Sequence, residues 1–372
     1  MRIALLEPYY TGSHADWVDG YATASGHEVI PLVLKGQFWK WRMHGGAVTL
    51  ARRFREQDLA VDLLLATDML DLTTFLALTR DLTYDTPVAL YLHENQLTYS
   101  LRPGEKRDLH YGFINYASAL VADAVFFNSA FHREAFFDEL PRLLKHFPDY
   151  NELNTVRGLQ DKSYVLSLGL DLCRFDAHRP PSALYGDELP ILLWNQRWEY
   201  DKNPGELFRA LYVLQGEGLD FGVALLGERF VRVPPEFEMA RERLGERIVH
   251  FGYVADPATY ARWLWQADIV VSTAIHEFFG AAVVEALYCN CFPVLPWRLT
   301  YPNYMSPEYH SRCLYHDFDE LVALLRAAIG GDKQTRRISF RDRVARYDWS
   351  KMAGIYDSVL ESVAPSFPRG RR

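Results

Sequence analysis

Cysteine and net positive charge are both scarce in this sequence. Its 372 residues include four cysteines, Cys173, Cys289, Cys291 and Cys313. That number is too small for a disulfide framework in a chain of this length, so we expect ordinary buried thiols. The formal net charge is −8, which is the wrong sign for a protein that coats nucleic acid nonspecifically.

Signals for export and for membrane insertion are missing as well. Met1 to Leu6 runs directly into an apolar strand pattern, without the basic start and small-residue cleavage site of a signal peptide. The most apolar stretch, 278–297, is interrupted by Glu285 and by two prolines, so we interpret it as a buried helix and strand. We therefore expect a cytoplasmic protein without a membrane partner.

The length and the hydrophobic pattern predict the fold class. A single core usually stops growing at about 250 to 300 residues, so 372 residues predict two domains. Short apolar runs alternate with longer amphipathic stretches, which is typical of βα units that build a parallel sheet. We predict an α/β protein with two Rossmann-like parallel-sheet domains facing each other across a cleft.

The predicted domains are 1–170 and 191–347, joined by a turn-rich linker over 171–190 and followed by a C-terminal helix and tail over 348–372. Strands are expected at 3–6, 29–34, 62–66, 88–92, 124–127 and 164–167, and then at 191–194, 222–226, 248–251, 269–272 and 292–295. Helices are expected at 17–25, 72–80, 109–122, 204–214, 258–265, 281–288, 319–328 and 349–363.

Ligands of open parallel sheets bind beyond the carboxyl ends of the strands, so the loops there are the candidate sites. The first such loop runs from Glu7 to His14 and contains one glycine, Gly12. It does not match the GxGxxG fingerprint, which argues against a nicotinamide or flavin cofactor. Taken alone, a single glycine between strand and helix is also explained by an ordinary turn.

The second candidate loop, 195–204, offers two cations, Arg197 and Lys202. A nucleotide diphosphate that leaves in a reaction concentrates negative charge, so its site needs cations close by. A solvated loop in which both cations pair with Glu199 and Asp201 is the alternative.

The third candidate loop places Glu277 ahead of an apolar helix that carries Glu285. A carboxylate on an apolar helix is costly unless it binds something, and carboxylates accept hydrogen bonds from the vicinal hydroxyls of a ribose or a sugar ring. The alternative is that Glu285 merely caps the helix or pairs with an arginine.

Two basic stretches could meet a nucleic acid. Residues 35–55 hold six cations and no acid, interleaved with Phe38, Trp39 and Trp41, and Lys40 and Arg42 flank Trp41. Proteins commonly bind unpaired bases with cations that contact the phosphates and aromatic rings that stack on the bases. A solvated helix face with core aromatics explains this stretch equally well. The second stretch comprises Lys333, Arg336, Arg337, Arg341, Arg343 and Arg346 against Asp332 and Asp342; an ordinary basic helix at a domain end explains it more readily.

Taken together, these motifs resemble the GT-B glycosyltransferases of family four. The mark of that family, two glutamates separated by seven residues with an intervening Phe-Gly, reads here as Glu277 to Glu285 with Phe279-Gly280. The other elements that follow in the expected order are Arg197, Lys202, Gly227 and Phe251-Gly252-Tyr253-Val254.

Stretches 5–14, 91–99, 127–129 and 277–280 narrow the resemblance to the tRNA-queuosine α-mannosyltransferases. This resemblance covers nearly the whole chain, with 141–162 and the C-terminal tail least marked. It implies that mannose passes from GDP-mannose to the cyclopentenediol of queuosine at the wobble position of a tRNA of the tRNA-Asp type. It also implies retention of the anomeric configuration, no cofactor and no metal, with 1–170 on the acceptor side and 191–347 binding the nucleotide sugar.

The resemblance also implies roles for individual residues. Glu285 would bind the donor ribose, Glu277 the mannose hydroxyls, and Arg197 with Lys202 the diphosphate. His93 would lie near the reacting sugar, although a hydrogen-bonded structural role is the alternative. The remaining donor-side residues are Gly12, Gly227, Tyr253, Val254, Phe279 and Gly280, and the acceptor or RNA side comprises His14, Lys40, Trp39, Trp41, Arg42, Glu94, Asn95 and Asn128.

Other functions and one metal motif stay open at this point. A transferase of the same fold acting on a glycolipid, glycan or small molecule would share every donor residue, and a non-catalytic RNA or nucleotide-sugar binding protein could keep the fold. The Asp317-Phe318-Asp319 triplet precedes a helical stretch, so capping explains it better than metal binding.

Overall fold

The computed structural model describes residues 1–102, 104–181, 189–227, 234–331, 336 and 338–364. They form two compact units. One comprises Met1–Leu101, Glu105–Asp171 and Tyr347–Arg372, and the other comprises Arg102–Gly104 and Leu172–Arg346. Each unit contains a six-stranded sheet with only parallel neighbours among its strands, so the predicted α/β class with two parallel-sheet domains is confirmed.

The sheet of the first unit has the strand order β2-β1-β3-β4-β5-β6. Its strands are β1 (Arg2–Tyr10), β2 (Glu28–Lys35), β3 (Leu63–Thr67), β4 (Val88–Leu92), β5 (Ala124–Phe127) and β6 (Ser163–Val165). The chain first moves to one side of β1 and then to the other, so the topology reverses between β1 and β3. A crevice forms at the carboxyl ends of strands at such a reversal, where ligands of open α/β sheets bind.

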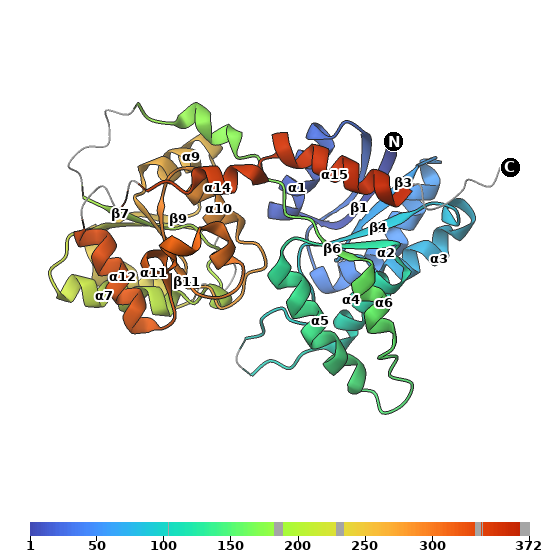
Figure 1. Ribbon diagram of the computed structural model, residues 1–372, viewed down its shortest axis with the longest axis horizontal. Coiled ribbons are helices and arrows are strands. Elements are labelled where there is room, and N and C mark those ends of the chain that lie inside the picture. Colours follow the sequence, from blue (N-terminus) through green and yellow to red (C-terminus); the bar gives the residue numbers. More distant parts are fainter. Residues whose placement is uncertain (103, 182–188, 228–233, 332–335, 337, 365–372) are drawn as a thin grey trace. The chain divides into compact units, whose positions relative to one another are not determined.

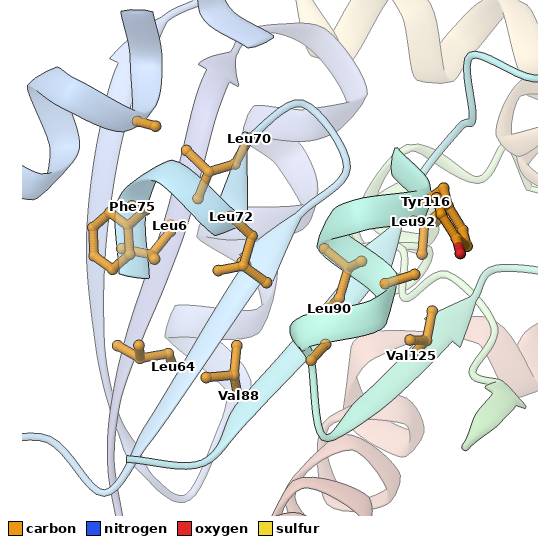
Figure 2. Packing of buried hydrophobic residues seen from close by; sticks show 14 of the residues in the cluster. Leu6, Leu64, Leu70, Leu72, Phe75, Val88, Leu90, Leu92, Tyr116 and Val125 are labelled. Atoms are coloured by element: carbon orange, nitrogen blue, oxygen red, sulfur yellow. The ribbon is translucent and has the colours of Figure 1, made fainter. Parts of the chain in front are cut away.

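Helices connect these strands: α1 (Gly12–Ala24), α2 (Trp39–Glu56), α3 (Leu72–Thr83), α4 (Leu109–Val121), α5 (Ala130–Lys145) and α6 (Thr155–Asp161). Figure 2 shows how Leu64, Leu90 and Phe75 pack on one face of the sheet with side chains from the helices that cover it. Strands β3 and β4 are buried along their whole length, which explains why they read as continuous apolar runs.

The C-terminal helix α15 (Trp349–Val363) belongs to the first unit and contacts α1 (Figure 1). A Cβ atom on Gly20 or Gly169 would lie 2.0 Å or 2.5 Å from the Trp349 indole, so both glycines leave room for that ring. The Asp357 carboxylate accepts hydrogen bonds from the Tyr21 and Ser25 hydroxyls. The helix that ends the chain therefore completes the core of the domain that begins it.

The sheet of the second unit has the order β12-β11-β10-β7-β8-β9. Its strands are β7 (Ile191–Trp194), β8 (Gly222–Leu226), β9 (Ile248–Gly252), β10 (Ile269–Val271), β11 (Phe292–Pro296) and β12 (Leu314–Tyr315). The helices are α7 (Pro204–Gly216), α8 (Glu236–Leu244), α9 (Pro257–Gln266), α10 (Ala281–Tyr288), α11 (His310–Cys313), α12 (Phe318–Gly330) and α14 (Arg341–Val344). The topology reverses between β7 and β10, so the loops after these two strands share one crevice position.

The structure differs from the sequence prediction at several boundaries. β1 runs on to Tyr10, so Glu7 to Tyr10 are strand residues and not a loop, and the short strand β12 was not predicted. The first part of the predicted linker, Cys173–His178, is a 3-10 helix (η1) of the second unit that contacts α9, while 182–188 and 365–372 lie outside the described residues. Stretch 278–297 contains α10 and β11 as expected, and no helix among the described residues has the length and apolar character to cross a membrane.

Candidate functional site

A buried ion pair lies at the topology reversal of the first unit. Glu7, in the carboxyl half of β1, is fully buried, and its Oε2 lies 3.0 Å from Nδ1 of His14 in the first turn of α1. The other carboxylate oxygen, Oε1, accepts a 2.6 Å hydrogen bond from the backbone amide of Tyr9. Glu7 therefore fixes the orientation of the His14 ring through one of its two nitrogens.

Two residues from the neighbouring strands join this pair. His93, after β4, lies with its ring centroid 4.3 Å from that of His14, and its backbone amide donates a 2.7 Å hydrogen bond to Asp68, after β3. The Nε2 atom of His93 is buried and has no hydrogen-bond partner within the described part of the chain. The carboxyl ends of β1, β3 and β4 thus assemble a polar cluster that the sequence marked only through His14 and His93.

Burial and charge give the two imidazoles opposite states. Burial alone would lower the pKa of His14, but the carboxylate of Glu7, supported by Asp68 and Glu94, outweighs it and raises this pKa to about 9. Burial, and then the charge on His14, hold the pKa of His93 well below its ordinary value. At neutral pH His14 is therefore a cation and His93 a neutral ring.

The same cluster is where the described residues could hold a metal ion. The donor atoms of Glu7, His14 and His93 all lie within 4.8 Å of one another, and two imidazoles with one carboxylate suit zinc. A metal would have to displace the proton of His14, because only a neutral imidazole ligates. Our expectation of no metal stays a prediction.

The loop after β4 is held by its own amide side chains. Oδ1 of Asn95 accepts hydrogen bonds from the amides of Leu97 and Thr98, and the Asn128 side chain donates to the carbonyl of His93. Both asparagines are buried. The structure therefore gives Asn95 and Asn128 a part in positioning the His93 loop, whereas Glu94, which accepts from Gln96, is partly exposed.

A second buried ion pair lies at the topology reversal of the second unit. Nζ of Lys202 is 3.0 Å from Oε2 of Glu277 and 3.1 Å from Oδ2 of Asp201, and it donates to the carbonyl of His276. Burial opposes the charge on Lys202, but the carboxylates of Glu277 and Asp201 outweigh burial and raise the pKa of Lys202. Burial likewise opposes ionisation of Glu277, but the charge on Lys202 outweighs burial and lowers the pKa of Glu277. Both groups are therefore ionised at neutral pH.

Arg197 adds a more exposed cation beside this pair. Its guanidinium lies 3.4 Å from the Glu199 carboxylate with about half of its side chain exposed (48%), and its charge acts on both Lys202 and Glu277. The pairings expected for a solvated loop are thus present. Lys202 is nevertheless 4% exposed, which a solvated loop does not produce and which indicates a built site.

Glu285, on α10, has two partners that sequence analysis did not name. Its Oε2 accepts a 2.7 Å hydrogen bond from the Tyr260 hydroxyl, and its Oε1 lies 3.1 Å from a guanidinium nitrogen of Arg174. Asn195, after β7, donates to the same Tyr260 hydroxyl and to the carbonyl of Ala282. The alternative that Glu285 pairs with an arginine is therefore correct, but a carboxylate has room for further donors. The sequence contains no periodic signal that links Arg174 or Tyr260 to Glu285.

Three of the predicted donor-binding residues are glycines, and the local structure explains why each position favours glycine. A Cβ on Gly227 would lie 2.1 Å from the carbonyl oxygen of Gln196, so this glycine allows the loops after β7 and β8 to approach closely. Gly12 and Gly280 have φ of +49° and +80°, where glycine is favoured; Gly12 is the first residue of α1, and Gly280 directly precedes α10.

The other predicted donor residues differ in exposure. Phe279 is buried, whereas Tyr253, after β9 at one end of the sheet order, is 64% exposed and Val254 is partly exposed. The hydroxyl of Tyr304 donates to the carbonyl of Phe279. Phe279 therefore supports the Glu277 loop from inside the unit.

The first basic stretch lies on α2, but its two tryptophans differ. Trp39 packs against Tyr111 with ring centroids 5.0 Å apart, and Lys40 lies over both rings, whereas Trp41 is 62% exposed. Arg42 donates from Nε to the carbonyl of Lys35. Trp39 is partly buried by this packing, so its predicted role on the RNA side stays a prediction, and Phe38 (78% exposed) joins Trp41 on the surface.

The second basic stretch is largely occupied by internal contacts. Arg341 pairs with Asp176 and covers the Tyr288 ring, and Arg343 donates to the Ser306 hydroxyl. Lys333 and Arg337 lie outside the described residues. Asp317 caps α12 by accepting from the amide of Glu320, which confirms capping for that triplet.

Comparison with known proteins identifies the family. Residues 2–170 match the family model described as tRNA-queuosine alpha-mannosyltransferase N-terminal. The tRNA-queuosine alpha-mannosyltransferase of Drosophila melanogaster is 36% identical over 315 residues, which cover 82% of each chain. A GDP-mannose-dependent alpha-(1-6)-phosphatidylinositol dimannoside mannosyltransferase of Mycobacterium tuberculosis is 24% identical over 206 residues, 54% of this chain and 53% of that protein.

Solved structures support the fold. Sucrose-phosphate synthase from Thermosynechococcus elongatus superposes with a TM-score of 0.74 at 14% identity, covering 98% of this chain and 100% of that one. Anabaena HepE in complex with UDP-glucose gives a TM-score of 0.70 at 16% identity, covering 97% and 100%. These likenesses confirm the predicted GT-B fold. With 36% identity over most of its length to a curated member, the chain belongs to the tRNA-queuosine α-mannosyltransferase family.

Proposed function

We propose that this protein transfers mannose from GDP-mannose to queuosine at the wobble position of tRNA, with retention of configuration and without a metal or other cofactor. The observation that carries the proposal is the ion pair of the buried Lys202 with Glu277 at the β7/β10 reversal, in a chain of this family. The acceptor is taken from the name of the Drosophila relative, and GDP-mannose from the name of the mycobacterial one.

The donor groups of the second unit suit a nucleotide sugar. Lys202 and Arg197 present two positive charges to a diphosphate, and charge that grows on the leaving group is stabilised by cations fixed in advance. Glu277 is ionised and partly exposed, so it can accept hydrogen bonds from sugar hydroxyls. Glu285, which accepts a hydrogen bond from the Tyr260 hydroxyl, would accept those of a ribose.

The chemistry breaks the bond between the mannose anomeric carbon and the phosphate oxygen and forms one to an acceptor hydroxyl on the same face. The leaving phosphate takes the acceptor proton, so no dedicated carboxylate base is needed. His93 is neutral at neutral pH and offers a ring that can donate or accept a hydrogen bond near the reacting sugar. The first unit, which the family model matches, supplies the acceptor side.

The tRNA partner would be bound with modest, salt-sensitive affinity, because the net charge of −8 leaves only local basic surface for phosphates. Specificity would then come from the modified base. We propose the cytoplasm as the location of the protein.

The test is sugar transfer from radiolabelled GDP-mannose to tRNA from matched cells with and without queuosine. Label in the queuosine-containing pool alone establishes donor, acceptor and specificity together. Label in neither pool, from folded protein that slowly hydrolyses the donor, moves the acceptor to a glycolipid, glycan or small molecule. Glu277→Ala protein that still transferred mannose would contradict the role of the buried pair.

A further inference from the structure

Trp41 is exposed although tryptophan is normally buried. It lies in the first turn of α2 with 62% of its surface accessible, while Trp39, two residues earlier, packs against Tyr111. Phe38, which precedes the helix, is 78% exposed and has a left-handed backbone with φ of +52°. A bulky residue in that conformation is strained, and strain of this kind concentrates at functional positions.

The Trp41 ring is seated on a glycine of its own helix. A Cβ on Gly45, one turn further along α2, would lie 2.5 Å from Cε2 and Cζ2 of the indole, and its three nearest atoms all belong to that ring. The next glycine, Gly46, has a separate reason, because a Cβ there would meet Pro8 of β1. Glycine in a helix interior lowers the stability of the helix. Gly45 therefore costs helix stability, but it leaves room for the exposed indole of Trp41 at a fixed position.

The stretch of chain on both sides of Trp41 carries charge of one sign. No acidic residue occurs from Val29 to Arg55, and Lys40 and Arg42 are the immediate neighbours of Trp41 in the chain. Lys40 lies over the Trp39 and Tyr111 rings, and the Arg42 guanidinium donates to the Lys35 carbonyl, so contacts within the protein place both cations. A single-stranded nucleic acid complements this surface better than a protein or a neutral ligand, because its phosphates pair with cations and its bases stack on aromatic rings.

We propose that Trp41, seated on Gly45, is a platform on which an unpaired base of the substrate tRNA stacks. Phe38 provides a second aromatic face, and Lys40 and Arg42 hold the phosphates that flank the base. The inference rests on the proposed function, because it takes tRNA to be the acceptor. Unpaired bases are required, since only they expose a ring face to a side chain.

Trp41→Ala tests the platform directly in tRNA binding to the full-length protein. Stacking on one aromatic residue corresponds to an affinity loss of about 5-fold to 100-fold. The loss should not change the slope of affinity against salt, because no charge is removed. Lys40→Ala, in contrast, should reduce that slope by about 0.7, as expected for one phosphate contact on a single strand.

Gly45→Ala separates the platform from the fold. The new methyl group must displace the indole, while alanine favours the helix, so tRNA binding should weaken although thermal stability does not fall. Gly354→Ala, at an exposed position of α15 with no atom within 4 Å, is the matched control, and Val48→Ala removes an exposed apolar side chain from α2 itself. Both controls should bind tRNA as the unchanged protein does, and all variants should bind GDP alike.

The outcomes distinguish the platform from the proposed function. Wild-type tRNA affinity in both Trp41→Ala and Gly45→Ala overturns the platform, and mannose transfer by the same preparations shows that the function stands without it. Weaker tRNA binding by both variants supports the platform, even if the unchanged protein transfers no mannose and the proposed function fails.

Discussion

Nζ of Lys202 lies 3.0 Å from Oε2 of Glu277, which joins the loop after β7 to the loop after β10. Nothing in the local sequence connects these two residues, which are 75 positions apart. Because Lys202 is 4% exposed, its charge depends on this partner and on Asp201. The pair therefore holds these two loops of the second unit together and keeps both groups charged.

Removing one member should cost both stability and activity. We expect Glu277→Ala to abolish mannose transfer and to destabilise the protein by about 3 kcal/mol, since a buried cation loses a partner while Asp201 remains. Urea unfolding and transfer assays check this. Glu217→Gln is the control, because Glu217 pairs with Arg326 on the surface and its loss should change neither quantity. Full transfer by Glu277→Ala would contradict the assignment.

The same pair predicts the pH range of stability. Glu277 has a pKa below its ordinary 4.5, so its contribution is present above that value and is lost as the pH falls through the lowered pKa. Lys202 has a pKa above its ordinary 10.5, so its contribution is present below that value and is lost above the raised pKa. Melting curves from pH 3 to 11 should show this dependence in the unchanged protein and less of it in a Lys202→Met, Glu277→Gln double variant. Identical profiles would contradict it.

The hydroxyl of Tyr260 should matter for donor binding more than for chemistry. Tyr260→Phe removes the hydrogen bond that orients Glu285, and a bond to a charged group contributes about 1.5 to 3 kcal/mol. We expect KM for GDP-mannose to rise by about 10-fold or more with a smaller change in kcat. Tyr150→Phe, at a position 86% exposed, is the control. A drop in kcat alone would assign Tyr260 another role.

Asp357 should anchor the C-terminal helix to the first unit. Burial opposes its ionisation, but hydrogen bonds from the Ser25 hydroxyl, the Gly26 amide and the Tyr21 hydroxyl outweigh this and lower its pKa. Asp357→Ala should destabilise the protein by about 1 to 3 kcal/mol, because three donors lose their acceptor. The Asp357 contribution is present above pH 3.8 and is lost as the pH falls through the lowered pKa. Equal stability of Asp357→Ala and the exposed control Ser358→Ala would refute this anchoring.

Chelation tests whether the Glu7, His14 and His93 cluster holds an essential metal. We expect transfer to be unchanged after dialysis against EDTA, because the proton on His14 already balances the charge of Glu7. Elemental analysis of the dialysed protein provides a readout that does not depend on activity. A metal-free mechanism would be contradicted if dialysis abolished transfer and added zinc restored it. In that case zinc should not restore transfer to His93→Gln protein.

The sequence alone determined the class of fold and indicated the loops in which we propose that the chemistry occurs. The alternation of apolar runs and amphipathic stretches predicted β4, β5, β7, β8, α10 and α15 at their observed bounds, because these segments are specified by local periodicity. Lys202, Glu277, His14 and His93 were found because each follows a strand, and parallel strands bring their carboxyl ends to one edge.

Only the tertiary structure decided which side chains meet. Arg174 and Tyr260 on Glu285, Asp68 beside His93, and Trp349 over Gly20 and Gly169 are contacts between distant parts of the chain. The exposure of Trp41 and the packing of the partly buried Trp39 against Tyr111 were likewise undecided by the sequence. Periodicity assigns a residue to a face, but the order of strands in the sheet and the close packing of side chains determine what that face contacts.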